Sequence, residues 1–167
     1  MQFTDKWDAH FKASAAAWLP GVDWKLLKAQ CYQESRLDPL AVSPAGAKGL
    51  CQFMGGTFND VGRSLGWVSG ASAFDPELSI DGASYYMSKL RYTWRRNRTS
   101  DERQPLAQAS YNAGTGNILK AQALCANALL WAAISTCLPK VTGEKNTHET
   151  RTYVERIAKW FNIMRYQ

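Results

Sequence analysis

Apolar side chains that recur every three or four residues are the feature that most restricts how this chain can fold. One face of the helix predicted over residues 1–18 carries Phe3, Trp7, Phe11, Ala15 and Trp18. Leu19, Pro20 and Gly21 end that helix. No stretch shows the apolar–polar alternation with a period of two that is typical of a half-buried strand. The pattern therefore predicts an all-α or mainly α fold.

A second helix follows at once, and one of its positions is unusual. Asp23 is expected to be its N-cap, and Trp24, Leu27 and Cys31 fall on one face. The next step of three on that face is Glu34, which directs a carboxylate toward the core. Desolvation raises the pKa of a carboxyl group, as a general acid requires near neutral pH. An isolated glutamate more often lies at a helix end, turned to solvent or paired with a neighbour such as an arginine.

Turn and cap residues predict the remaining elements. Residues 37–49 contain two prolines and two glycines and are expected to form an extended loop beside the second helix. Asp75 followed by Pro76 predicts the start of a long helix through Leu90. Further helices are expected over residues 57–65, 104–113, 115–134 with a break, and 149–165.

Composition indicates a single domain over residues 1–167. The chain is 46% hydrophobic and only 20% charged, which is enough apolar material for a core. Its net charge of +6 suits an anionic partner such as nucleic acid, a cell-wall polymer or a membrane surface. Charge alone does not choose among these partners.

The four cysteines, Cys31, Cys51, Cys125 and Cys137, form no CxxC pair and no zinc-ligand spacing. Buried thiols are therefore expected in preference to disulfides. Cys125 and Cys137 could join only if the chain turns between them, because on one straight helix they would lie ~18 Å apart.

Residues 121–138 carry no charge, which raises the question of a membrane span. Polar residues interrupt this stretch, so a buried hairpin or core helix is expected instead. The first residues show no basic segment leading into an apolar one, and no secretory signal is predicted.

Five segments give the chain a recognisable order. They are residues 34–39 (ESRLDP), 43–54 (SPAGAKGLCQFM), 75–80 (DPELSI), 110–114 (SYNAG) and 149–154 (ETRTYV). In this order they resemble the motifs of the soluble lytic transglycosylase family, whose fold is lysozyme-like. The resemblance implies a helical domain with its active-site cleft at the C-terminal end of the second helix.

The resemblance also implies roles for individual residues. Glu34 matches the family's sole catalytic acid/base. The positions that match glycan-contacting or cleft-lining residues are Ser43, Gln52, Phe53, Met54, Tyr111, Asn112, Glu149 and Tyr153. Asn112 more specifically matches a residue that shapes its turn. Four positions depart from the family's usual residues: Cys51 for methionine, Gly55 for proline, Ser79 for asparagine and Ser110 for alanine.

The implied activity is cleavage of the β-1,4 bond between N-acetylmuramic acid and N-acetylglucosamine in peptidoglycan, with a 1,6-anhydro product. Most glycosidases use two carboxylates, whereas this family is understood to use one. Asp38, Asp60 or Asp75 would have to act as a second carboxylate in an ordinary hydrolase like goose-type lysozyme. A wall-binding module without catalysis is the other alternative, and it would need no acid.

The basic run at residues 91–98, with interleaved aromatics, invites a nucleic-acid hypothesis. A solvated helix end or a general attraction to anionic envelope surfaces is preferred, with no specific nucleic acid, and a monomer is expected. The HExxH pattern fails at Thr152, and with only His10 and His148 no metal and no cofactor are predicted. A small cationic chain of this kind resembles a bacteriophage lysis enzyme or virion-associated domain, made in the host cytoplasm and acting on the wall in the periplasm.

Overall fold

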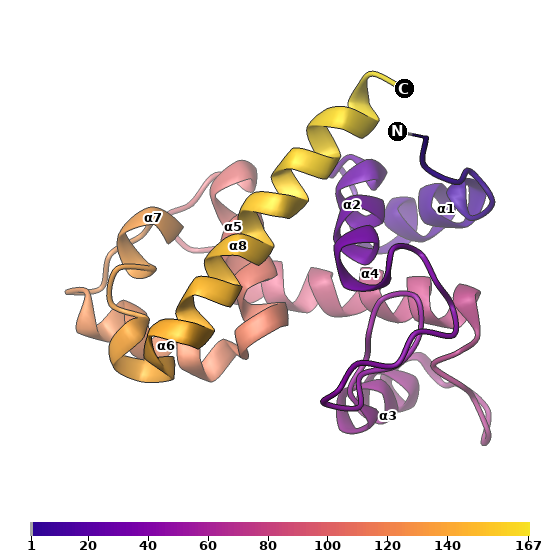
Figure 1. Ribbon diagram of the computed structural model, residues 1–167, viewed down its shortest axis with the longest axis horizontal. Helices are drawn as coiled ribbons and strands as arrows, with labels where there is room; N and C mark the ends of the chain where they lie inside the picture. The colour runs from indigo at the N-terminus through magenta and orange to yellow at the C-terminus, as the bar shows by residue number, and fades with distance from the viewer. Residues whose placement is uncertain (1) are drawn as a thin grey trace. The chain divides into compact units, whose positions relative to one another are not determined.

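The computed structural model describes residues 2–167, and these contain eight helices and no sheet (Figure 1). The helices are α1 (Asp8–Trp18), α2 (Trp24–Ser35), α3 (Gly55–Leu65), α4 (Pro76–Thr93), α5 (Ser100–Ala113), α6 (Thr115–Leu124), α7 (Trp131–Ile134) and α8 (Pro139–Arg165). The prediction of a mainly helical fold is confirmed. The chain forms two compact units. The N-terminal unit comprises residues 2–86 and 157–167, and the central unit comprises residues 87–156.

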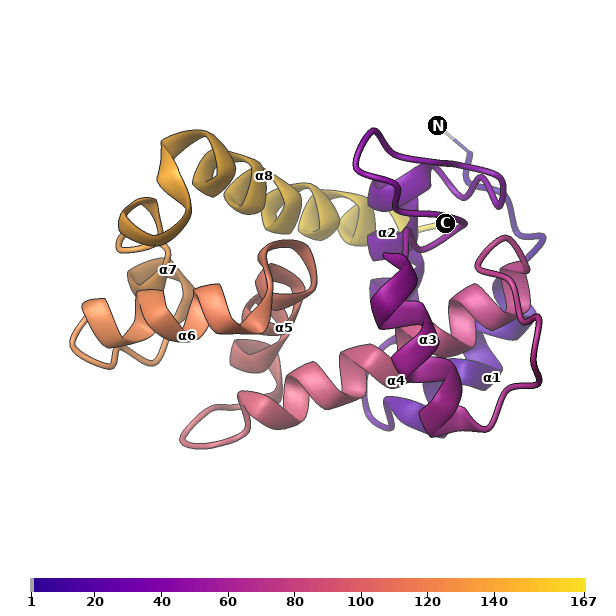
Figure 2. The same cartoon turned by 90° about the horizontal axis from the view of Figure 1, so that it is seen from below.

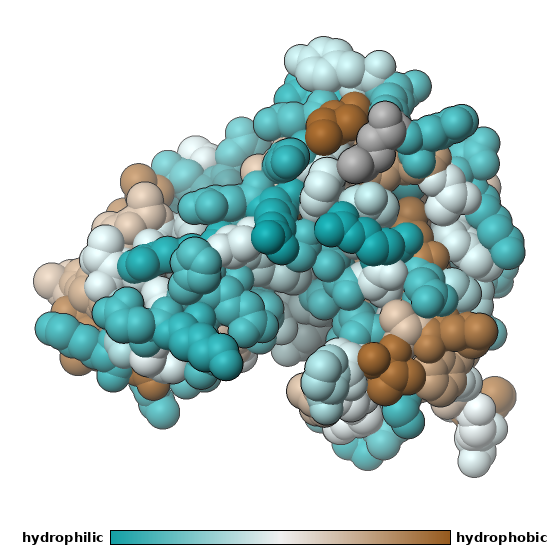
Figure 3. All heavy atoms as spheres, viewed as in Figure 1, coloured by the Kyte–Doolittle hydropathy of each residue, from teal (hydrophilic) through white to brown (hydrophobic). Residues whose placement is uncertain are grey.

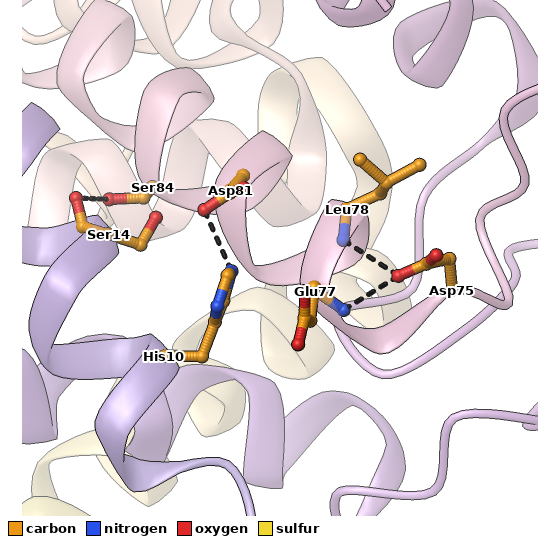
Figure 4. Close-up of polar contacts among 7 residues, drawn as sticks. All are labelled: His10, Ser14, Asp75, Glu77, Leu78, Asp81 and Ser84. Atoms are coloured by element: carbon orange, nitrogen blue, oxygen red, sulfur yellow. Dashed lines mark hydrogen bonds and ion pairs between the residues drawn. The ribbon is translucent and has the colours of Figure 1, made fainter.

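The N-terminal unit is built on α1, α2 and the first half of α4. The first helix begins at Asp8 rather than near Phe3, although Phe3 is still buried. Polar contacts join α1 to its neighbours: the ammonium of Lys28 lies 2.5 Å from Asp8, and the hydroxyl of Ser84 donates to the carbonyl of Ser14. Figure 4 shows the contacts between α1 and α4.

Two predicted caps in this unit are confirmed. The carboxylate of Asp23 accepts a hydrogen bond from the amide of Lys25 at the start of α2. The carboxylate of Asp75 accepts from the amides of Glu77 and Leu78 at the start of α4 (Figure 4). Each cap satisfies amides that the first turn of a helix leaves unpaired.

The loop between α2 and α3 folds back on itself (Figure 1). Lys48 and Phe53 exchange both backbone hydrogen bonds, at 2.9 and 3.0 Å, and Val42 forms a second bridge with Lys48. Gly49, with φ +82°, lies where an added Cβ would come within 1.8 Å of the carbonyl oxygen of Ala73. This loop is therefore ordered by its own backbone and by the segment that precedes α4.

The central unit contains α5, α6, α7 and parts of α4 and α8. Helix α5 begins at Ser100, earlier than the predicted residue 104, because Thr99 and Glu102 form a capping box. The break predicted within residues 115–134 is a turn between α6 and α7, which lie next to each other in Figures 1 and 2. Helix α8 begins at Pro139, ten residues before the prediction, and is interrupted at Gly143. Among residues 2–167, no helix is long and apolar enough to span a bilayer.

The expectation of free thiols is wrong. Cys31 is joined to Cys51, and Cys125 to Cys137, with Cα–Cα distances of 4.5 and 5.8 Å. The second bond meets the condition drawn from the sequence, since the chain turns between α6 and α7. The first bond joins α2 to the loop that follows it, and no short sequence pattern predicts this contact.

Candidate active site

Glu34 lies in the last turn of α2 and is half-buried. The helix ends immediately after it, where Arg36 and Leu37 both adopt left-handed backbone conformations with φ 59° and 63°. The amide of Arg36 closes the helix on the carbonyl of Tyr32 at 2.9 Å. The guanidinium of Arg36 lies 4.7 Å from the centre of the Tyr32 ring and 4.9 Å from that of Trp160.

Two connections fix the end of α2 to the adjoining loop. The hydroxyl of Ser35 donates to the carbonyl of Leu50 at 2.6 Å and accepts from the amide of Asp38 at 3.2 Å. One helical turn before Glu34, Cys31 is bonded to Cys51. The carboxylate of Glu34 is thus carried on a helix end that is held both covalently and by hydrogen bonds.

The loop residues Ser43 and Gln52 have structural partners. Ser43 accepts from the amide of Ala47 through its side chain at 3.0 Å. The side-chain amide of Gln52 donates to the carbonyls of Ala41 and Gly49 at 3.1 and 2.8 Å, and its backbone has φ 55°. Gln52 therefore uses its donors to hold the loop and keeps a carbonyl oxygen as an acceptor.

Phe53 and Met54 differ sharply in exposure. The side chain of Phe53 is 2% exposed and packs against Phe58, with ring centres 5.8 Å apart. Direct glycan contact by this ring stays a prediction, and its small exposed fraction and its contact with Phe58 favour a packing role. Met54 is 49% exposed, and Leu40 and Val42 of the same loop are exposed too. Figure 3 shows apolar surface over the loop between α2 and α3.

In the central unit, Asn112 and Glu149 line a common pocket of about 220 Å³. The pocket is polar: its other walls are Ala113, Asn117, Thr142, Asn146 and Thr150. The side-chain carbonyl of Asn112 accepts from the hydroxyl of Thr150 at 2.8 Å, which ties α5 to α8. Sequence reasoning missed Asn117 and Asn146, because residues 117–148 match no family motif. The one signal that could have suggested them is the number of asparagine side chains in this part of the chain.

The two tyrosines of the central unit differ in exposure. Tyr111 is half-buried near the C-terminal end of α5, and the following Gly114 turns the chain into α6 with φ 89°. Tyr153 is 5% exposed. The contact of Tyr153 with substrate stays a prediction, and only this small exposed fraction is open to it.

Departures from the family pattern now have explanations. Cys51 is half of a disulfide, and its amide donates to the hydroxyl of buried Ser79 at 3.0 Å. Ser110 is also buried: it accepts from the indole of Trp94 at 2.9 Å and donates to the carbonyl of Leu106. Gly55 is the first residue of α3, a position where proline is equally suitable.

Three other carboxylates that could assist Glu34 are engaged elsewhere. Asp38 accepts from the amide of Leu40 at 2.9 Å, Asp75 caps α4, and Asp60 pairs with Arg63 on the exposed face of α3. Asp38 therefore has a turn role and Asp60 a surface role, and the cap role predicted for Asp75 is confirmed.

The basic run has a structural role in the central unit. The guanidinium of Arg91 donates to the Gln104 side chain at 2.6 Å and to Ser100, and Arg98 donates to the carbonyl of Leu129. Burial, and secondarily the charge of Arg103, lowers the pKa of Arg91. Trp94 is 1% exposed. Its ring is therefore closed to base stacking, which argues against the nucleic-acid hypothesis.

Across residues 2–167, no group of three histidine, cysteine, aspartate or glutamate side chains is arranged to hold a metal ion.

Comparisons with known proteins agree with this geometry. The family described as "Transglycosylase SLT domain" matches residues 11–132. The membrane-bound lytic murein transglycosylase F of Yersinia enterocolitica is 34% identical over 160 residues, covering 87% of this chain and 30% of that protein. The protein of the same name from Desulfosudis oleivorans is 30% identical over 159 residues, covering 87% of this chain and 34% of its own length.

Solved structures show the same fold. The 70 kDa soluble lytic transglycosylase of Escherichia coli has a TM-score of 0.77 at 26% identity, covering 98% of this chain and 25% of its own. That enzyme has also been solved in complex with bulgecin A. A lytic transglycosylase of Pseudomonas aeruginosa, solved as an inactive glutamate-to-glutamine variant, has a TM-score of 0.75 at 24% identity and covers 96% of this chain and 24% of its own.

This chain spans about a third of the length of the curated relatives that it matches. The family match covers α2 with Glu34, the following loop and the SYNAG segment, in the order read from the sequence. The chain therefore belongs to the Transglycosylase SLT domain family, with the lysozyme-like helical fold of the soluble lytic transglycosylases.

Proposed function

We propose that this protein is a peptidoglycan lytic transglycosylase that cleaves the β-1,4 bond between N-acetylmuramic acid and N-acetylglucosamine. The observation that carries this proposal is Glu34, half-buried at the end of α2 and fixed there by the Cys31–Cys51 bond, in a chain of the SLT family. Relatives named lytic murein transglycosylases support the same activity.

In the proposed reaction Glu34 is the only general acid and base. It gives its proton to the bridging oxygen as the bond from the muramoyl C1 breaks, and the leaving N-acetylglucosamine keeps a free 4-hydroxyl. The resulting carboxylate then takes the proton of the muramoyl 6-hydroxyl, whose oxygen attacks C1 and closes the 1,6-anhydro ring. An internal nucleophile has a high effective concentration, so no water molecule has to be positioned.

Other residues have proposed supporting roles. The side-chain carbonyl oxygen of Gln52 is proposed to accept a hydrogen bond from the glycan, and the hydroxyl of Ser43 to donate one to it. Met54 is proposed as an apolar contact. Asn112 and Glu149 are proposed to bind a sugar in the polar pocket of the central unit. Tyr111 is proposed to bind substrate, as its match to the family motif implies.

Ordinary hydrolysis is the second candidate, and the mass of the products distinguishes the two. Purified peptidoglycan is digested and the muropeptides are weighed. Anhydro ends are lighter by one water molecule than the reducing ends of hydrolysis. Anhydro ends are expected, because Asp38, Asp60 and Asp75 all have other partners. Reducing ends alone would show that the chain is a hydrolase.

The role of Glu34 is tested by Glu34→Gln. This variant keeps the shape of the side chain and removes the titrating proton, so we expect a normal circular dichroism spectrum and at least ~10³-fold less product. Asp60→Asn is the matched control, since Asp60 is exposed on α3 and pairs with Arg63. Wild-type rates in Glu34→Gln would mean that another group is the acid.

We further propose that the enzyme acts in the periplasm, as a bacteriophage lysis enzyme or a virion-associated enzyme. Two disulfide bonds favour an oxidising compartment. The positive net charge favours adsorption to anionic envelope polymers. Purified protein should lyse bacteria whose outer membrane has been permeabilised and leave intact cells unaffected. Lysis of intact cells at the same rate would show that the enzyme does not need to reach the wall from the periplasm, and would contradict this proposal.

A further inference from the structure

The N-terminal unit has a groove that the proposed reaction does not use. It is an open groove of about 360 Å³ formed by α1, α4 and the segment that follows α3. Its walls include Trp18, Trp67, His10, Asp81 and Ser14, and it contains no residue of α2 or of the loop that follows α2. This volume lies within the range of small-molecule sites, ~300–1,000 Å³.

Two indole rings form the apolar part of the groove. Trp18 is 38% exposed, and the edge of its ring contacts Tyr85 at a centre-to-centre distance of 5.0 Å. Trp67 packs 4.9 Å from the ring of Phe58. An added Cβ on Gly62 or Gly82 would come within 2.9 or 3.0 Å of the Trp67 ring, so both glycines are needed to seat it. Rings already held in place lose little conformational entropy when a ligand stacks on them.

The polar part of the groove is an imidazole–carboxylate pair. His10 Nε2 lies 3.0 Å from Asp81 Oδ1, as Figure 4 shows, and the two side chains keep 27% and 35% of their surface exposed. This contact uses one polar atom of each group, so Nδ1 of His10 and the second oxygen of Asp81 remain to bind a ligand. Ser14, which is 4% exposed, has a hydroxyl without a hydrogen-bond partner in the structure.

These features together select a class of ligand. A pyranose ring presents an apolar C–H face, which stacks on an indole, and a rim of paired hydroxyls, which suits a carboxylate beside an imidazole. The small side chains of Ala13 and Ala17 line the same groove. A purely apolar peptide or a lipid would cover the second oxygen of Asp81, which His10 does not contact, without offering it a hydrogen bond, and this is costly.

We propose that this groove is a second, non-catalytic saccharide site that binds a hexopyranose of a glycan strand. It would hold one strand of the wall while another reacts at Glu34, which favours repeated cleavage of an insoluble substrate through an increased effective concentration. The identity of the glycan as peptidoglycan rests on the proposed function, whereas the binding of a pyranose to the groove does not.

Nuclear magnetic resonance of the indole N–H groups tests the site. Glu34→Gln protein, which does not turn over substrate, is titrated with the tetrasaccharide of N-acetylglucosamine. We expect the indole signals of Trp18 and Trp67 and the ring signals of His10 to shift together with a single affinity. In Trp18→Ala the affinity reported by the Trp67 signal should fall by ~10-fold, as expected for the loss of one stacking surface. Trp18→Phe should keep most of the wild-type affinity.

The outcomes separate this proposal from the proposed function. Signals of the loop around Gln52 that shift while Trp18 and Trp67 stay unchanged at saturation would overturn the second site alone. An affinity reported by the Trp67 indole that is the same in Trp18→Phe and Trp18→Ala would overturn the stacking role of Trp18. Product formation by the wild-type enzyme is measured separately, so a chain that binds saccharide at the groove but makes no anhydro product would contradict only the proposed function.

Discussion

The two disulfide bonds close segments of similar length but lie in very different surroundings. Cys31 and Cys51 are separated by 20 residues, and Cys125 and Cys137 by 12. Loop-closure entropy therefore gives both nearly the same stabilising effect, about 3 kcal/mol. Both sulfurs of the first pair belong to residues that are 0% exposed, whereas Cys125 and Cys137 are each partly exposed.

This difference shows that the same covalent link serves two purposes. In the N-terminal unit it joins the helix that carries Glu34 to the loop that carries Gln52. In the central unit it closes the turn between α6 and α7, a segment without a recognised motif. Burial and connection to the site, rather than loop length, should decide what each bond contributes to stability and activity.

The largest effect is expected from Cys31→Ala combined with Cys51→Ala. The double variant loses the cross-link and leaves two buried sites underfilled, so the free energy of unfolding should fall by about 4–5 kcal/mol. Urea unfolding measures this loss, and release of anhydro muropeptides should drop with it. Full activity in the double variant would show that the bond does not position Glu34.

A large effect is also expected from Gly49→Ala in the same loop. The added methyl group would meet the carbonyl oxygen of Ala73 at 1.8 Å, and φ of +82° disfavours any side chain. We expect a loss of about 3 kcal/mol in unfolding free energy. Gly46→Ala is the matched control, because it has a similar φ of +90° but open space around the added atom. It should lose only about 1 kcal/mol, and equal losses would rule out the steric explanation.

A smaller effect than that of the buried pair is expected from Cys125→Ala combined with Cys137→Ala. Stability should fall by the loop-closure effect alone, about 3 kcal/mol, since a partly exposed bond leaves little cavity behind. The rate of peptidoglycan cleavage should stay within twofold of wild type, as measured by product release. Mass spectrometry after brief treatment with a thiol reductant should find this pair reduced before the buried one, and the reverse order would contradict the difference in exposure.

The smallest effect is expected from Thr99→Ala at the start of α5. This change removes the hydroxyl that accepts from the amide of Glu102 and breaks the capping box. A loss of about 1 kcal/mol is expected in thermal or urea unfolding. Activity at low temperature should be unchanged, and Thr99→Ser should restore the stability.

Local signals in the sequence were sufficient for much of the fold. Asp23 and Asp75 marked two helix starts correctly, because a cap acts on amides only two or three residues away. The start of α5 was placed too late, because the capping box formed by Thr99 and Glu102 was not recognised in the sequence.

The candidate site was less predictable, because its parts are joined by contacts between segments. The pairing of Cys31 with Cys51 and the burial of Phe53 against Phe58 follow from how the loop folds, which no short pattern encodes. Asn117 and Asn146 approach Asn112 only through the packing of α5, α6 and α8. The interruption of an apolar helical face singled out Glu34, and the match to the family's acid/base position gave it the role proposed here.

The bond at Cys31 also limits which changes in chain length α2 can accept. Cys31 is tied to the loop, and Glu34 follows three residues later on the same helix. Each residue inserted between them would rotate the carboxylate by about 100° and advance it by about 1.5 Å. The turn between α6 and α7 carries no comparable angular constraint. Insertions and deletions among homologous chains should therefore accumulate in that turn and be absent between Cys31 and Glu34.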